Sequence, residues 1–199
     1  MKGKINGIIF DLDGTLLDSF SVRVDSWHRA LYLNGADVDR SKIEPFIGLP
    51  GISLASIFSN RPDKVESDEE ILFKERLWEV GFFPDVIPTL AKIEGMGIKW
   101  VIVTSARREF VDMLPIAGEK VITIDDVKNG KPETEAYEKA AEMMKIKHEN
   151  IMVVGDSIND MIPAKKLGMF SVLVTHGMNR GINIRDVEIK EIGELMDLL

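Results

Sequence analysis

Six polar residues of this 199-residue chain have the types and the spacing to bind a phosphate group beside a metal ion. They are Asp11, Asp13, Thr104, Lys131, Asp156 and Asp160. Carboxylates that cluster repel one another, and a hard divalent cation relieves that repulsion. Mg²⁺ fits best, because it prefers few carboxylates together with waters and a phosphate oxygen. One hydroxyl and one ammonium could bind the phosphate. The set therefore indicates magnesium and phosphate chemistry, provided that the fold brings these residues together.

Short apolar segments precede most of these residues and read as buried strands. They span 8–10, 100–103, 121–124, 151–154 and 170–174. Continuous apolar runs suit strands that are covered on both faces. Helical patterns separate them; one spans 132–144, with Pro132 at a first helical position. This alternation predicts an α/β fold with a doubly wound, Rossmann-like parallel sheet, in which ligands bind at the carboxyl ends of the strands.

The alternation breaks between residues 17 and 83, where no convincing buried strand occurs. Helices are expected at Val22–Leu33, around Ser53–Phe58 and from Ser67, which forms a capping box with Glu70. The acidic run Glu66–Glu70 is most simply a solvated helix start. We therefore expect two domains. Residues 1–16 and 84–199 would form the sheet-containing core, and residues 17–83 would form a helical insert.

Composition and charge exclude several classes of protein. The chain has no cysteine, which excludes thiol catalysis, disulfides and cysteine-based metal sites. A net charge of −8 argues against a general nucleic-acid binder. No apolar run approaches the roughly 18 residues that a membrane span needs, and the N-terminal apolar stretch is too short for a signal peptide. We therefore expect a cytoplasmic protein with no membrane or nucleic-acid partner.

The Asp11–Gly14 motif has two simpler interpretations, since Asp and Gly favour turns and D-x-D-G also opens calcium-binding EF-hand loops. The EF-hand interpretation fails, because its sixth position would be Leu16 instead of Gly and its twelfth Val22 instead of Glu. The turn interpretation does not explain why Gly-Asp-Ser-Ile-Asn-Asp (155–160) occurs later in the same chain.

Four segments resemble the four motifs of the haloacid dehalogenase-like superfamily, in the same order. They are DLDGTLLDS (11–19), VIVTSA (101–106), GKP (130–132) and VGDSINDM (154–161). The insert is similar to the helical cap of the branch that contains phosphoglycolate phosphatase and β-phosphoglucomutase. The resemblance implies a Rossmann-like catalytic core with an α-helical cap over residues 17–83.

The resemblance also implies the roles of the carboxylates. Asp11 would be the nucleophile that forms an aspartyl-phosphate. Asp13 would protonate the leaving oxygen and then activate water. Asp11 and Asp156, with the main-chain carbonyl of Asp13, would hold Mg²⁺.

Other residues would bind the phosphate or support the site. Thr104 and the following amides, including that of Ser105, would bind phosphoryl oxygens. Lys131 would offset the charge between Asp11 and the phosphate, and Asp160 would hold Lys131 or metal-bound water. Arg23 on the first cap helix could reach the substrate. Thr104 could also cap the segment that follows it.

Departures from the motifs of related enzymes reduce the number of possible activities. An acid at Asp13 disfavours a dehalogenase, which needs no proton donor. A β-phosphoglucomutase usually has His where this chain has Arg23, and Arg after the glycine that corresponds to Gly48; the segment Gly48–Gly51 has no arginine. A phospho-signalling receiver would carry these residue types in another order. A catalytically inactive, partner-binding member stays an alternative.

The sequence therefore predicts a Mg²⁺-dependent hydrolase of a small phosphomonoester, similar to phosphoglycolate phosphatase, with a phosphomutase or pyrophosphatase as the alternatives. Phosphoglycolate, pyrophosphate, sugar phosphates and nucleotides all remain open as substrates. We expect a monomer whose cap opens and closes through linkers near Leu17 and Phe82.

Overall fold

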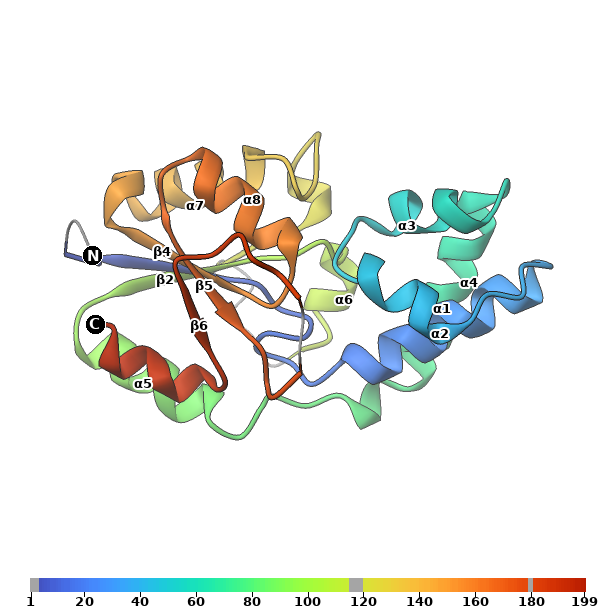
Figure 1. Ribbon diagram of the computed structural model, residues 1–199, viewed down its shortest axis with the longest axis horizontal. Coiled ribbons are helices and arrows are strands. Elements are labelled where there is room, and N and C mark those ends of the chain that lie inside the picture. The colour runs from blue at the N-terminus through green and yellow to red at the C-terminus, as the bar shows by residue number, and fades with distance from the viewer. Residues whose placement is uncertain (1–3, 115–119, 179–180) are drawn as a thin grey trace.

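The computed structural model describes residues 4–114, 120–178 and 181–199. Within them a six-stranded parallel sheet has the order β3-β2-β1-β4-β5-β6 (Figure 1). The strands are β1 (Gly7–Phe10), β2 (Lys99–Val103), β3 (Val121–Ile122), β4 (Ile151–Gly155), β5 (Phe170–Val174) and β6 (Val187–Ile189). The order reverses between β1 and β4, which confirms the doubly wound α/β fold.

Helices cover both faces of this sheet because successive strand residues point to opposite sides. Ile8 and Phe10 belong to one apolar cluster, and Ile9 belongs to another. The first cluster includes residues of α5 (Val86–Gly95), α6 (Arg108–Val111) and the 3-10 helix η6 (Ile192–Asp197); the second includes residues of α7 (Glu135–Met144) and α8 (Ile158–Lys166). Two short 3-10 turns, η4 (Ile124–Asp126) and η5 (His148–Asn150), complete this part.

The segment between β1 and α5 is helical, as expected. It contains α1 (Phe20–Leu33), α2 (Arg40–Ile43), α3 (Gly51–Phe58) and α4 (Pro62–Glu75), with 3-10 turns η1 (Glu44–Phe46) and η2 (Leu77–Glu79). A third apolar cluster, which includes Trp27 and Leu54, draws only on residues of this segment. The division into a core and a cap over residues 17–83 stays a prediction, and this separate cluster supports it.

The chain enters and leaves the helical segment at one place. Leu17 and Phe82 form an antiparallel bridge, and the Phe83 amide donates to the Leu16 carbonyl at 3.0 Å. The two predicted linkers therefore lie side by side, directly after the loop that carries Asp11 and Asp13.

Several local predictions were wrong in their boundaries. Ser67 does not begin a helix, because α4 starts at Pro62, where a proline at the first turn needs no amide partner. Likewise α7 begins at Glu135, and Pro132 precedes it in a turn. The strand expected over 121–124 ends at Ile122, because the Asp126 carboxylate accepts the Thr123 amide and hydroxyl and starts η4.

Strand β6 was missed, because its three residues form too short an apolar run to be recognised. As regards membranes, none of the helices in the described residues has both the length and the apolar character needed to cross a bilayer.

Candidate active site

Three of the predicted site residues follow neighbouring strands at one edge of the sheet. Asp11 follows β1, Thr104 follows β2 and Asp156 follows β4, and β1 lies between the other two strands. The Asp11 amide donates to the Val154 carbonyl at 2.9 Å, so the sheet pairing continues into the site and fixes this backbone. Parallel strands that end together thus place residues from distant parts of the chain at one point.

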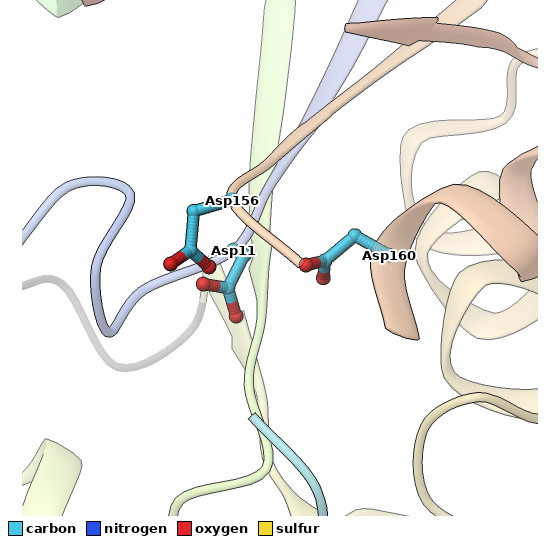
Figure 2. Close-up of side chains that lie close together, drawn as sticks. All are labelled: Asp11, Asp156 and Asp160. Carbon is cyan, nitrogen blue, oxygen red and sulfur yellow. The ribbon is translucent and has the colours of Figure 1, made fainter. Parts of the chain in front are cut away.

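Asp11, Asp156 and Asp160 form a cluster of buried carboxylates (Figure 2). One oxygen of each lies within 4.8 Å of the others. Lys131 lies against this cluster: its Nζ is 2.5 Å from Asp11 Oδ1 and 2.6 Å from Asp160 Oδ1. The structure therefore brings together four residues that the sequence separates by as much as 149 positions.

Asp160 has both carboxylate oxygens engaged by protein groups. Its Oδ1 accepts hydrogen bonds from Lys131 and from the Tyr137 hydroxyl, the latter at 3.0 Å. Its Oδ2 accepts from the Ser157 hydroxyl at 2.6 Å and the Ser157 amide at 3.2 Å, which forms the capping box that starts α8. This carboxylate is placed to orient Lys131, as the resemblance implies.

Burial governs the electrostatics of the cluster. It raises the pKa of Asp11 to about 7, with Lys131 opposing the shift and Asp160 adding to it. Burial alone would lower the pKa of Lys131, but Asp11 and Asp160 outweigh it, and the pKa lies well above its usual value. Burial, with Asp160 beside it, also raises the pKa of the Tyr137 hydroxyl. Lys131 is thus a fixed positive charge.

The donor set fits a divalent cation. Three carboxylates within 4.8 Å of one another face a single ammonium, so the cluster carries an excess of negative charge in a buried place. A hard cation with oxygen ligands would balance that charge, and Mg²⁺ needs only one or two carboxylates when waters and phosphate complete its shell. Since both oxygens of Asp160 are already engaged, Asp11 and Asp156 are the better ligands.

Asp13 is held from the helical segment. The Ser19 hydroxyl donates to Asp13 Oδ1 at 2.7 Å, and Arg23 Nε lies 3.4 Å from the same oxygen. Arg23, which is half-buried, also pairs with Glu69, Nη1 to Oε1 at 3.2 Å. The position of the Asp13 carboxyl therefore depends on α1 and α4 as well as on the loop after β1.

Gly14 lets Asp156 approach the loop after β1. Its φ is +80°, and a Cβ at this position would lie 2.4 Å from Asp156 Oδ2. Any side chain here would displace that carboxylate and would also strain the backbone.

Thr104 and Ser105 make contacts of their own. Thr104 Oγ1 accepts the Ala106 amide at 3.0 Å, so it caps the turn after β2, while the helix α6 begins only at Arg108. The Ser105 hydroxyl donates to the Gly48 carbonyl of the helical segment at 3.0 Å. Both residues are therefore at the junction of the sheet and the helices.

A cavity of about 210 Å³ lies between the sheet edge and the helical segment. Five predicted site residues line it: Asp11, Asp13, Arg23, Thr104 and Ser105. Apolar side chains such as Trp27 and Phe73 form part of its wall. Its size suits a small molecule and not a polymer.

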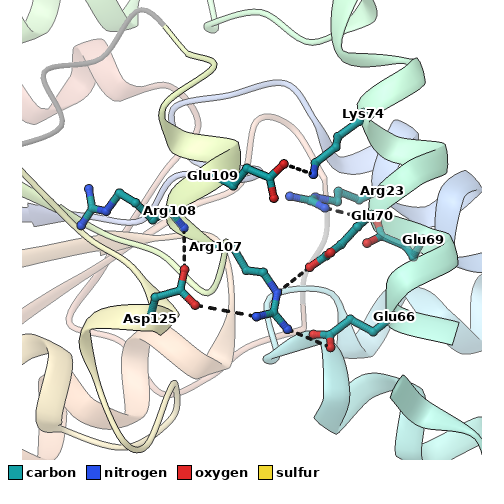
Figure 3. A network of polar contacts seen from close by, with 9 residues as sticks. All are labelled: Arg23, Glu66, Glu69, Glu70, Lys74, Arg107, Arg108, Glu109 and Asp125. Atoms are coloured by element: carbon teal, nitrogen blue, oxygen red, sulfur yellow. Dashed lines mark hydrogen bonds and ion pairs between the residues drawn. The ribbon is translucent and has the colours of Figure 1, made fainter. Parts of the chain in front are cut away.

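A network of charged residues, which the sequence alone does not indicate, surrounds this cavity (Figure 3). Arg107 pairs with Glu66 and Glu70 of α4, and Lys74 of α4 pairs with Glu109 of α6. The expectation of a solvated acidic run was wrong for Glu69, which is 2% exposed. No pattern in the sequence distinguishes this buried carboxylate from its neighbours, because its partner Arg23 lies 46 positions away.

The fold and the site together point to one family of proteins. The fold is a parallel α/β sheet beside a helical segment, and the site is a cluster of carboxylates and one lysine at the carboxyl edge of that sheet. The family model described as haloacid dehalogenase-like hydrolase matches residues 8–174, and the chain belongs to this family.

Named relatives and a solved structure agree with this assignment. The chain is 31% identical to the pyrophosphatase PpaX of Bacillus mycoides (strain KBAB4), over 86% of this chain and 84% of that protein. It is 30% identical to the phosphoglycolate phosphatase of Escherichia coli O157:H7, over 98% of this chain and 92% of that protein. The crystal structure of a hydrolase from Pseudomonas syringae has a TM-score of 0.88 at 22% identity, with 96% of each chain covered, which shows the shared fold.

Proposed function

We propose that this protein is a Mg²⁺-dependent phosphatase that hydrolyses a small phosphomonoester through an aspartyl-phosphate at Asp11. The observation that carries the proposal is the ion pair between Lys131 and Asp11 beside Asp156, under a cavity of small-molecule size. A buried carboxylate next to a fixed ammonium is suited to attack an anionic group, because the ammonium offsets the repulsion between the two anions. A relative named phosphoglycolate phosphatase supports the same class of reaction.

Asp11 and Asp13 would act in sequence. An Asp11 oxygen forms a bond to phosphorus while the bond from phosphorus to the alcohol oxygen breaks, and Asp13 gives its proton to that oxygen. Asp13 then takes a proton from water, and the hydroxide attacks the phosphorus of the aspartyl-phosphate to free Asp11. The hydrogen bond from Ser19 would keep Asp13 directed at the leaving oxygen.

The remaining predicted residues would bind the phosphate and the metal. Asp11, Asp156 and the Asp13 carbonyl would hold Mg²⁺, which supplies charge neutralisation for the phosphate. Thr104 and the Ser105 amide would donate to phosphoryl oxygens, and Lys131 would balance their charge. Arg23 lines the cavity, and its contact with substrate stays a prediction. A monomeric, cytoplasmic enzyme without nucleic-acid or membrane partners is the expectation that accompanies this function.

Release of inorganic phosphate from a panel of small phosphomonoesters tests the proposal. We expect turnover with Mg²⁺, its loss in EDTA, and at least a 10³-fold lower kcat for Asp11→Asn, whose amide is a poor nucleophile. Asp37→Asn, an exposed aspartate in the helical segment, is the matched control and should keep full activity. Turnover that persists in Asp11→Asn would refute the aspartyl-phosphate.

Two alternatives have specific tests. The similarity to PpaX makes pyrophosphate a required member of the panel. Interconversion of sugar monophosphates with a bisphosphate primer, without net release of phosphate, would instead identify a phosphomutase. A stable protein that binds Mg²⁺ but transforms none of these compounds would favour a binding role.

A further inference from the structure

The three basic residues among the described lining of the cavity are already paired with carboxylates. They are Arg23, Lys74 and Arg107. Figure 3 shows these three side chains directed at acidic partners across the junction between α4 and the sheet edge. How firmly its carboxylate partners hold each cation determines whether that cation can bind a negatively charged ligand group.

Arg107 is bound by three carboxylates. Its Nε lies 2.6 Å from Glu70 Oε1, its Nη2 lies 3.1 Å from Glu66 Oε2, and its Nη1 lies 3.8 Å from Asp125 Oδ1. Lys74 Nζ lies 2.7 Å from Glu109 Oε1. To meet an anionic ligand, either cation would have to share or leave these partners.

Arg23 is the most constrained of the three. Its guanidinium carbon lies 3.5 Å from the centre of the Phe73 ring, and its nitrogens contact Asp13 and Glu69. Glu69 is almost completely buried, so removing Arg23 from it would leave a buried carboxylate without its partner. Arg23 is therefore held on its present partners and is not available to a second anion.

Carboxylates outnumber cations on the wall of the cavity, beyond the reaction centre. The cavity is lined by Glu66, Glu69, Glu70, Glu109 and Asp125 in addition to Asp11 and Asp13 of the reaction centre. Burial raises the pKa of Glu69 to about 7, but even without it four carboxylates beyond that centre face three cations. A ligand group with its own negative charge would be repelled, whereas a hydroxyl could accept or donate hydrogen bonds and an ammonium would be attracted.

We infer that the cavity accepts phosphomonoesters whose alcohol portion is neutral or cationic and disfavours those that carry a second carboxylate or phosphate. The inference rests on the proposed phosphatase function and specifies its substrate class. Phosphoglycolate and pyrophosphate, which the names of the relatives suggest, would then be poor substrates of this protein.

Three esters of similar size isolate the charge of the alcohol portion: 2-phosphoglycolate, 2-hydroxyethyl phosphate and phosphoethanolamine. They end in a carboxylate, a hydroxyl and an ammonium. We expect kcat/KM for the hydroxyl and ammonium esters to exceed that for phosphoglycolate by about tenfold or more. Hydrolysis of phosphoglycolate at an equal or higher kcat/KM would overturn the inference, while the proposed phosphatase function would stand.

A charge-removing variant tests whether the wall causes the preference. Glu70→Gln removes one carboxylate from Arg107, so it should raise kcat/KM for phosphoglycolate about threefold or more relative to the hydroxyl ester. Glu138→Gln, an exposed glutamate of α7, is the control and should leave the ratio unchanged. A ratio that Glu70→Gln does not move would overturn the assignment of the preference to this wall, provided that the variant melts at the wild-type temperature.

The failure of the proposed function has a different signature. If none of the three esters and no general chromogenic phosphate ester releases phosphate with Mg²⁺, the phosphatase proposal fails and the inference fails with it. If turnover occurs, the order of the three esters alone decides the inference.

Discussion

Lys131 Nζ lies 2.5 Å from Asp11 Oδ1, although the two residues are 120 positions apart in the chain. The same ammonium lies 2.6 Å from Asp160. One buried cation thus connects the proposed nucleophile, at the end of β1, with a carboxylate in the first turn of α8. The pairing keeps two mutually repelling carboxylates at short range, and it makes Lys131 the residue through which the candidate site is most directly tested.

Replacement of Lys131 by Met should lower kcat by roughly 10²-fold, because a fixed charge that stabilises the reacting anion is lost. The same change removes a positive charge beside the proposed metal ligands, so the Mg²⁺ concentration for half-maximal activity should fall severalfold. Magnesium titrations of steady-state activity measure both quantities. Lys147→Met, an exposed lysine remote from the site, should change neither. Unaltered kcat in Lys131→Met would remove this lysine from the proposed mechanism.

Replacement of Asp160 by Asn distinguishes positioning from metal binding. If Asp160 orients Lys131 and caps α8, Asp160→Asn should lower the free energy of unfolding by about 1–3 kcal/mol and kcat by about tenfold. The Mg²⁺ concentration for half-maximal activity should stay within about threefold of the wild-type value, because this carboxylate binds Lys131 and Ser157. Denaturant unfolding and magnesium titration give the two readouts. An increase of about 10²-fold in the Mg²⁺ requirement would instead make Asp160 a ligand.

Two glycines with similar backbone angles provide a matched pair. Gly14 has φ +80° and a Cβ there would lie 2.4 Å from Asp156 Oδ2, whereas Gly35 has φ +85° with no atom within 4 Å of its Cβ position. Both Gly→Ala variants should lose about 1–2 kcal/mol of stability from backbone strain. Only Gly14→Ala should also lose most of its Mg²⁺-dependent activity, because its methyl group displaces Asp156. Equal activities in the two variants would show that the position of Asp156 is not critical.

Glu69 should make stability depend on pH. Burial raises the pKa of this carboxyl from 4.5 to about 7, although Arg23 opposes the shift. The folded protein therefore holds the proton more tightly than the unfolded chain does. The stabilising contribution of Glu69 is complete below pH 4.5 and is lost as the pH rises through 7, a change on the order of 3 kcal/mol.

Urea unfolding of the wild type and of Glu69→Gln at several pH values measures this contribution. The difference in unfolding free energy between the two proteins should fall across that pH interval, because Gln cannot ionise. Glu138→Gln, which removes an exposed glutamate of α7, is the control for the loss of a carboxyl group. A wild-type to Glu69→Gln difference that rises with pH would mean that pairing with Arg23 outweighs burial.

Much of the fold and the proposed site follows from local sequence. The strands β1, β2, β4 and β5 are recognisable because each is mostly a run of apolar residues, a pattern that is typical of strands buried on both faces. The position of Asp11, Thr104 and Asp156 at strand ends follows directly, since parallel strands finish at one edge. The helical segment could be predicted because no buried strand is recognisable between residues 17 and 83. Its α4 begins at Pro62, however, and not at Ser67.

Only the tertiary structure decided how charges are paired around the cavity. The sequence presents Glu69 within an acidic run, but the fold buries it against Arg23, and it places Arg107 among three carboxylates of two different segments. Such pairings depend on how the helical segment packs on the sheet edge, and no local pattern encodes them. The reaction class can thus be inferred from residue types next to strands, whereas the preference for a substrate's charge arises from contacts between distant residues, which exist only in the folded chain.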